Sequence, residues 1–162
     1  FASDQMTEAV TLRAAKSNDL PTLQAFEQGI ILAERPYDAT LKPDPISYYD
    51  IGEMIEDPNA EVAVAEINGE LVASGYAIKK ASRHYVSPAY HAFIGFLFVV
   101  PEHRGKGLNQ KILKHLFAWA QTVGLPEVHL TVYPGNVSAI RAYEKVGFKP
   151  YLSEMRLNLE EF

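Results

Sequence analysis

Residues 99–109 read VVPEHRGKGLN and join a long apolar segment to an amphipathic one. Before them, residues 90–100 are rich in aromatic and β-branched side chains and predict a central buried strand. After them, residues 105–123 predict a helix with one apolar stripe, formed by Ile112, Leu113, Leu116, Phe117 and Ala120. A buried strand that leads through glycines into a strong helix is typical of an α/β protein.

The glycine loop between these two elements favours an anion site. Gly105 and Gly107 let backbone N–H groups turn toward one point, and the start of a helix adds unpaired donors and partial positive charge. Arg104 and Lys106 add full charges. We therefore expect a cradle for a phosphate group, although an ordinary strand-to-helix turn with two solvated cations has the same composition. The glycine spacing is neither that of a Walker loop nor that of a Rossmann fingerprint.

Outward from this centre, strands and helices alternate in the predicted α/β chain. Further strands are expected at residues 10–14, 61–67, 71–78, 127–133, 148–151 and 153–159, and further helices at 20–35, 46–55 and 136–146. Asn68-Gly69 predicts a tight hairpin turn. We expect one domain over residues 6–162, and we interpret residues 1–5, which precede Met6, as a cloning remnant.

Composition excludes several other functions. The 162 residues suit one globular domain, and a net charge of −5 argues against general nucleic-acid binding. The absence of cysteine excludes disulfides, thiolate metal sites and a cysteine nucleophile, and the five histidines lack metal-ligand spacing, so no metal is expected. No apolar run is long enough to span a membrane. We expect a cytoplasmic protein.

Two segments carry a resemblance to a known family. Residues 104–109, RGKGLN, resemble the Arg/Gln-x-x-Gly-x-Gly/Ala motif of the GCN5-related N-acetyltransferases, the GNAT family. Residues 136–148, NVSAIRAYEKVGF, are similar to a second signature of that family, and the two motifs follow in the family's order. The resemblance implies an α/β, single-domain GNAT-like fold with a mixed central sheet of about six to seven strands, flanked by about four helices. Asn109 departs from the motif, because Gly or Ala is usual there.

The resemblance implies acetyl-CoA as cosubstrate, without a metal. Its pyrophosphate would lie on Arg104, Gly105, Lys106, Gly107, Leu108 and Asn109, where the Asn109 side chain would either crowd or bond it. The pantetheine arm would pair with the backbone of Phe98, Val99 and Val100, opposite Asn136. Asn136 also suits a helix N-cap.

In the family, a tyrosine that matches Tyr143 donates a proton to the departing CoA thiolate. Tyr143 follows Asn136 by two helical turns and so shares its face, although a helix tyrosine is more often a core aromatic. The implied function is direct acetyl transfer to a primary amine of a small molecule or peptide. The alternative is a CoA-binding sensor or interaction module without catalysis. A homodimer stays open.

The base that deprotonates the amine is not assigned by the sequence. Residues 93–96, on the central strand, contain no carboxylate or other base. Tyr90, His91, Glu34 and Asp38 are alternatives, and each also suits an ordinary surface or packing role.

The acceptor is left open in the same way. Acidic side chains at Glu34, Asp38, Asp44 and Asp50 suit a cationic amine. Arg35 and Arg83 suit a substrate that bears a carboxylate.

Overall fold

The computed structural model describes residues 9–162, so the interpretation of residues 1–5 lies outside the described residues. The chain divides into two compact units between Thr131 and Val132, and each is described in turn. The first contains a mixed sheet with three helices and the second contains one helix, which confirms the predicted α/β class. One domain over residues 6–162 stays a prediction.

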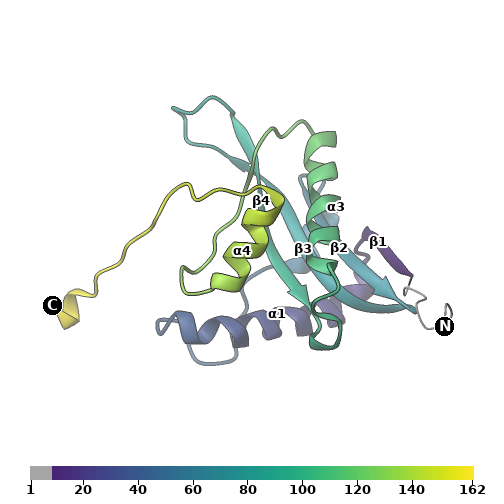
Figure 1. Cartoon of the computed structure of the whole chain (residues 1–162), viewed down its shortest axis with the longest axis horizontal. Coiled ribbons are helices and arrows are strands. Elements are labelled where there is room, and N and C mark those ends of the chain that lie inside the picture. Colours follow the sequence, from purple (N-terminus) through teal and green to yellow (C-terminus); the bar gives the residue numbers. More distant parts are fainter. Residues whose placement is uncertain (1–8) are drawn as a thin grey trace. The chain divides into compact units, whose positions relative to one another are not determined.

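The sheet has five strands rather than the six or seven predicted. In sheet order, which is also chain order, they are β1 (Val10–Ala14), β2 (Ala60–Ile67), β3 (Glu70–Ala81), β4 (Tyr90–Val99) and β5 (Val128–His129). The first four pair antiparallel and β5 joins β4 in parallel, so the sheet is mixed as predicted (Figure 1).

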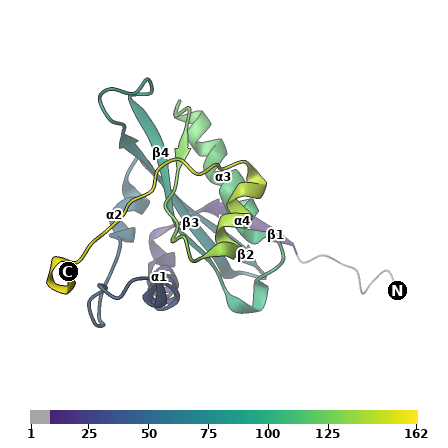
Figure 2. The same cartoon turned by 60° about the vertical axis from the view of Figure 1, so that its left-hand side comes forward.

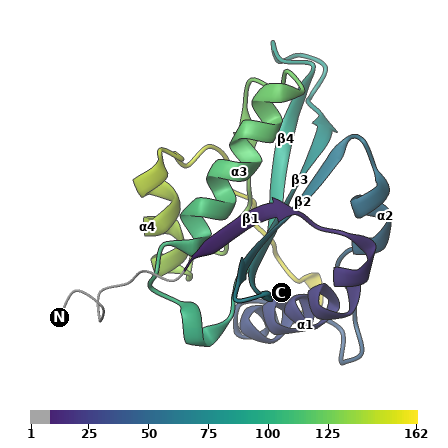
Figure 3. The same ribbon diagram turned by 90° about the vertical axis from the view of Figure 1, so that its right-hand side faces the viewer.

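Both faces of the sheet are covered by helices (Figure 3). On one face lie α1 (Leu20–Glu34) and α2 (Ile51–Glu56), and on the other lies α3 (Leu108–Thr122). Helix α2 begins at residue 51 rather than 46 because Asp50 caps it, accepting a hydrogen bond from the Glu53 N–H at 3.1 Å.

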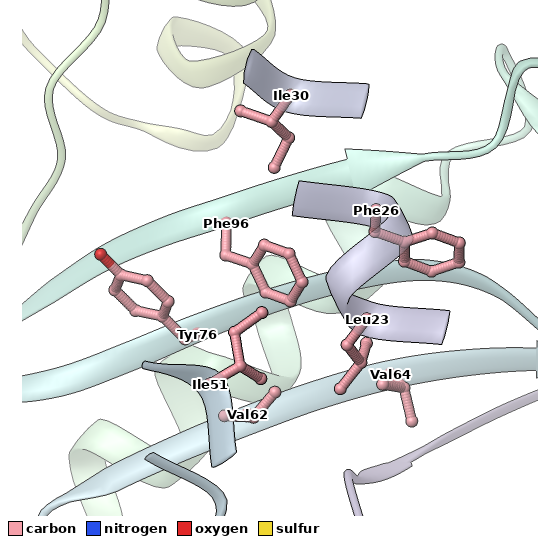
Figure 4. Packing of buried hydrophobic residues seen from close by; sticks show 8 residues of the cluster. All are labelled: Leu23, Phe26, Ile30, Ile51, Val62, Val64, Tyr76 and Phe96. Atoms are coloured by element: carbon pink, nitrogen blue, oxygen red, sulfur yellow. The ribbon is translucent and has the colours of Figure 1, made fainter. Parts of the chain in front are cut away.

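Two separate layers of apolar side chains hold these helices on the sheet. Between α1, α2 and the sheet, eight buried side chains form a cluster (Figure 4): Leu23, Phe26, Ile30, Ile51, Val62, Val64, Tyr76 and Phe96. On the opposite face, the α3 stripe is buried as predicted at Ile112, Leu113 and Leu116, whereas Phe117 is only partly buried. Phe117 therefore lies at the margin of the stripe.

The β2–β3 hairpin turns as the sequence predicts. Asn68 and Gly69 have φ values of 52° and 78°, the left-handed pair that a two-residue turn of this kind requires. The strands of the next hairpin pair over a longer stretch than predicted, because β3 continues past residue 78 to Ala81 and pairs there with Tyr90. Within the first unit, the end of the hairpin at which β3 connects to β4 extends beyond the end of α3 (Figure 2).

The second unit contains α4 (Val137–Val146), which begins and ends where the sequence predicts. Gly147, with φ of 111°, ends the helix. Residues 148–158 form no strand, so the strands predicted at 148–151 and 153–159 are wrong, and a short 3-10 turn at Leu159–Glu161 follows. Alternating apolar and polar side chains can place one side of a strand against a core, but the strand's backbone also needs a hydrogen-bonding partner. Residues 148–158 pair with none of the five described strands.

Candidate active site

A β-bulge in β4 marks the centre of the candidate site. Tyr76 pairs with Gly95 and Ser74 with Phe98, so two residues of β4 lie opposite Gly75 alone. Phe96 takes up the extra length with φ of 59°, and the Ser74 hydroxyl donates to its carbonyl oxygen at 3.1 Å. A bulge bends its strand and increases the local twist.

Just before the bulge, β4 parts from β5. Their parallel pairing covers only Ala92–Val128 and Phe93–His129, which also explains why β5 ends four residues earlier than predicted. Within residues 9–131, β4 therefore has one unpaired edge from residue 94 onward. An extended ligand that carries amides can add to such an edge as a further strand.

The end of β4 shows which backbone groups face that edge. The Val100 N–H donates to the Val72 carbonyl of β3 at 2.9 Å, and backbone groups alternate along a strand, so those of Val99 face away from β3. The Val99 carbonyl accepts from Arg104 Nε at 3.0 Å. The Arg104 guanidinium carbon lies 5.9 Å from the centre of the Phe98 ring. The structure thus brings Phe98, Val99, Val100 and Arg104 together.

The loop that follows is shaped for close approach of a ligand to the backbone. Gly105 and Gly107 have φ values of 80° and 76°, and a Cβ at either would meet no protein atom within 4 Å. Since these left-handed residues precede the helix, α3 begins at Leu108 rather than at the predicted residue 105. The first N–H groups of α3 have no acceptor within the helix, so they and the helix dipole can bind an anion here.

The remaining loop side chains differ in what they can offer. Leu108 is 2% exposed, so its side chain anchors the helix and only its backbone can reach a ligand. Asn109 is partly buried. Lys106 Nζ lies 2.9 Å from His103 Nδ1, which holds this cation over the loop.

In the second unit, α4 carries Asn136 and Tyr143. Asn136 is its N-cap, and its side-chain oxygen accepts from the Ala139 N–H at 3.3 Å. Tyr143 is partly buried, with its ring packed edge-on against Phe148 at 5.9 Å between ring centres. The structure therefore shows the capping role of Asn136 and, at Tyr143, a packed but only partly buried ring.

The structure separates the four candidate bases. His91 is buried, bonded through Nδ1 to the Ser82 hydroxyl at 2.8 Å and stacked on His129 at 3.8 Å between ring centres. Burial, followed by the nearby His129 and Lys80, lowers the pKa of His91. It lies five residues before the bulge, about 17 Å along the strand. His91 thus belongs to the far end of β4.

Tyr90 and Asp38 have local roles. Tyr90 is exposed, and Lys79 Nζ lies 4.3 Å from the centre of its ring. Asp38 Oδ1 accepts from the N–H and the hydroxyl of Thr40, at 2.9 and 2.5 Å, which fixes the turn after α1.

Glu34 has a different environment. It is half-buried, and burial raises the pKa of its carboxyl group, an effect that the neighbouring Tyr48 hydroxyl opposes and that nearby Asp38 reinforces. Tyr49 lies against the Tyr76 and Phe96 rings, with 5.1 and 5.6 Å between ring centres. Burial is also the main reason why the pKa of Tyr49 is raised.

The sequence analysis gave Tyr48 and Tyr49 no role in the site, and it missed a second acid, Glu27. Glu27 is 3% exposed, and its carboxylate accepts from the N–H groups of Tyr48 and Tyr49 at 2.9 and 2.8 Å. It therefore fixes the segment that carries both rings. Glu27 and Glu34 follow Leu23 at helical spacing, so the sequence could have placed both carboxylates on the apolar face of this helix.

Metal and membrane features can be stated for residues 9–162 only. No cluster of three or more His, Asp or Glu side chains there is arranged to hold a metal ion. None of the helices in that range is both long and apolar enough to cross a membrane.

Comparison with known proteins gives a family match. The model of the acetyltransferase (GNAT) family matches residues 27–148. An uncharacterized N-acetyltransferase of Bacillus subtilis is 37% identical over 54 residues, which cover 33% of this chain and 22% of the relative. An acetyltransferase of Pectobacterium atrosepticum is 32% identical over 89 residues, 53% of this chain and 55% of the relative. The matches thus span about a fifth and about half of these relatives.

The fold match extends over nearly the whole chain. The crystal structure of a predicted acetyltransferase from Clostridium acetobutylicum, with acetyl-CoA, covers 95% of this chain and 99% of its own. Its TM-score is 0.71 at 18% sequence identity, which shows a shared fold.

Proposed function

Because the chain belongs to the acetyltransferase (GNAT) family, we propose that it transfers an acetyl group from acetyl-CoA to the nitrogen of a primary amine. The observation that carries the proposal is the open edge of β4, which leads from the bulge at Phe96 into the glycine loop at the start of α3. A strand edge for an amide-bearing arm and an anion cradle beside it fit one ligand, a CoA thioester. The acceptor is a small-molecule or peptide amine.

The first unit supplies most of the proposed acetyl-CoA site. Arg104, Lys106 and the N–H groups of residues 105–109 would hold the pyrophosphate by charge and by hydrogen bonds. The pantetheine amides would pair with the β4 edge at Val99, with Phe98 and Val100 on either side. From α4, Asn136 would add a side-chain amide.

The proposed reaction is a single transfer. The amine nitrogen attacks the thioester carbonyl carbon, and backbone N–H groups near Phe98 and Val99 stabilise the negative charge that develops on oxygen. The carbon–sulfur bond then breaks, and Tyr143 gives its hydroxyl proton to the CoA thiolate. The nitrogen loses its extra proton to water as the amide is formed, and water returns a proton to Tyr143. No acyl-enzyme is formed in this scheme.

The test is an assay of CoA release with a panel of primary amines, beside calorimetry of acetyl-CoA binding. We expect acetyl-CoA to bind and at least one amine to release CoA and become acetylated. Binding without release by any amine, with the thioester intact over hours, would support the sensor alternative, which the lack of a carboxylate in residues 93–96 favours. Absence of acetyl-CoA binding would contradict both functions.

A further inference from the structure

The proposed reaction needs a group that removes a proton from the acceptor amine, and β4 offers no such group at the bulge. Its residues at the bulge are Gly95 and Phe96. A side chain at position 95 would displace Tyr76, because an added Cβ would lie 2.6 Å from the Tyr76 hydroxyl oxygen. A proton acceptor for a reaction at the bulge therefore has to come from another element.

Helix α1 brings such a group to the same side of the sheet. Leu23 and Ile30 belong to the buried cluster that includes Phe96 (Figure 4). Glu34 follows Ile30 by four residues, so it continues this core-facing stripe at the last turn of α1. It is a half-buried carboxylate where the spacing predicts an apolar side chain.

Two tyrosines connect Glu34 with the bulge. The Tyr48 hydroxyl lies near enough to the Glu34 carboxylate to lower its pKa, which opposes the effect of burial. Tyr49, its neighbour in sequence, is hydrogen-bonded to the backbone of Phe96 and lies close enough to Glu34 for the carboxylate charge to raise the pKa of its hydroxyl. The Glu27 carboxylate accepts hydrogen bonds from the backbone N–H groups of both tyrosines, so it fixes the position of the segment that carries them.

The charge around Glu34 favours a cation. Asp38 lies near enough to raise the pKa of the Glu34 carboxyl further. Arg35 is engaged elsewhere: it forms an ion pair with Asp44 at 2.7 Å and donates to the Lys42 carbonyl at 2.9 Å. Two neighbouring carboxylates attract an ammonium group. The same surroundings disfavour a substrate carboxylate.

We propose that Glu34 binds the ammonium group of the acceptor and takes its proton, and that the acceptor is a cationic alkylamine without a carboxylate beside its nitrogen. This inference rests on the proposed function. The ammonium N–H bond breaks, the proton passes to the Glu34 carboxylate and then to water, and the neutral amine attacks the thioester. Each transfer thus gives one acetamide, one CoA thiol and one released proton.

The test compares Glu34→Gln with Glu56→Gln, which removes an equal charge from an exposed position at the end of α2. With butylamine and acetyl-CoA at pH 7, we expect kcat/KM to fall about 10²–10⁴-fold in Glu34→Gln, the usual loss for a positioned base. Glu56→Gln should match the parent, and neither change should alter the acetyl-CoA Kd. Glycine should be a poorer acceptor than butylamine for the parent.

The pH profile distinguishes a base from a merely structural carboxylate. The groups that face Glu34 are Asp38, Tyr48 and Tyr49, and burial raises its own pKa, so parent activity should fall as acid protonates this carboxylate. Glu34→Gln should instead need an amine that is already neutral. The ratio of the parent kcat/KM to that of Glu34→Gln should then shrink about tenfold per pH unit as pH rises toward the amine pKa. Equal pH slopes for the parent and Glu34→Gln would overturn the role of Glu34 as base.

A binding measurement keeps this inference separate from the proposed function. NMR titration with butylammonium reports on the cation site without turnover. We expect Glu34→Gln to weaken binding about tenfold and Glu56→Gln to leave it unchanged. Equal butylammonium binding by all three proteins overturns the acceptor site, whether or not the parent releases CoA. Loss of binding in Glu34→Gln supports the site even if no amine is acetylated, an outcome that contradicts only the transferase function.

Discussion

Gly95 shows how one residue shapes the candidate site. It faces the same side of the sheet as its partner Tyr76, and the Tyr76 ring fills the space that a side chain at position 95 would need. The Tyr76 ring in turn supports Tyr49, whose hydroxyl bonds the backbone at the bulge. A side chain at position 95 would therefore disturb the packing of Tyr76 and, through it, of Tyr49.

Gly95→Ala should lower stability, because its Cβ would lie 2.6 Å from the Tyr76 hydroxyl oxygen and would displace the ring. Overpacking of this kind costs about 1–3 kcal/mol. Gly52→Ala is the matched control: its Cβ would meet Leu20 at an ordinary 3.5 Å, and alanine inside a helix gains about 0.5–1 kcal/mol over glycine. Urea unfolding measures both variants. Equal stability of the two would show that Tyr76 yields without cost.

Gly107 has open space around it, so a substitution there acts through backbone conformation. With φ of 76°, a β-branched residue is strained, whereas asparagine tolerates this region. Gly107→Val should therefore distort the N–H groups at the start of α3 and weaken acetyl-CoA binding at least tenfold, by calorimetry, while Gly107→Asn should bind more like the parent. Unchanged affinity in Gly107→Val would remove the loop from the cosubstrate site.

At the scale of elements, hydrophobic spacing predicted the helices better than the strands. The stripe of α3 is a property of one segment, and Ile112, Leu113 and Leu116 are buried as it requires. Strands depend on partners from elsewhere in the chain, so the alternation at residues 148–159 produced strands that the structure lacks. The bulge had no clear local signal, because it places an aromatic residue, Phe96, at positive φ.

The α3 stripe can be tested at Leu116, which is fully buried against the sheet. Leu116→Ala leaves a cavity beside Gly75, and such truncations cost about 2–5 kcal/mol. Lys114→Ala, on the exposed side of the same helix, should stay within about 0.5 kcal/mol of the parent. Thermal unfolding of the two variants gives the comparison, and equal midpoints would contradict the assigned face of α3.

At the scale of the whole molecule, the two sequence motifs fall in different units. The anion loop belongs to the first unit and α4 to the second, and the boundary at Thr131–Val132 lies between them. Local sequence could identify each motif, because each depends on a few consecutive residues: glycines at positive φ in one, and an Asn cap with a helix in the other. Among the four candidate bases, Glu34 could have been preferred only by combining helix spacing with the tyrosine segment.

Tyr143 is the proton donor of the proposed transfer, which makes this tyrosine the test of the whole-molecule proposal. Tyr143→Phe removes one oxygen and keeps the ring that packs against Phe148, so folding and acetyl-CoA binding should persist. If Tyr143 protonates the thiolate, kcat should fall about 10²–10⁴-fold with an unchanged acetyl-CoA Kd.

Tyr151→Phe is the control for removal of a tyrosine hydroxyl, because Tyr151 is 74% exposed in the second unit and has no proposed role. Its kcat and its acetyl-CoA Kd should both match those of the parent. Weaker acetyl-CoA binding in Tyr143→Phe with unchanged kcat would make Tyr143 a binding residue. If neither quantity changed, proton donation would have to come from another group or from water, since the thiolate is a good enough leaving group to need little help.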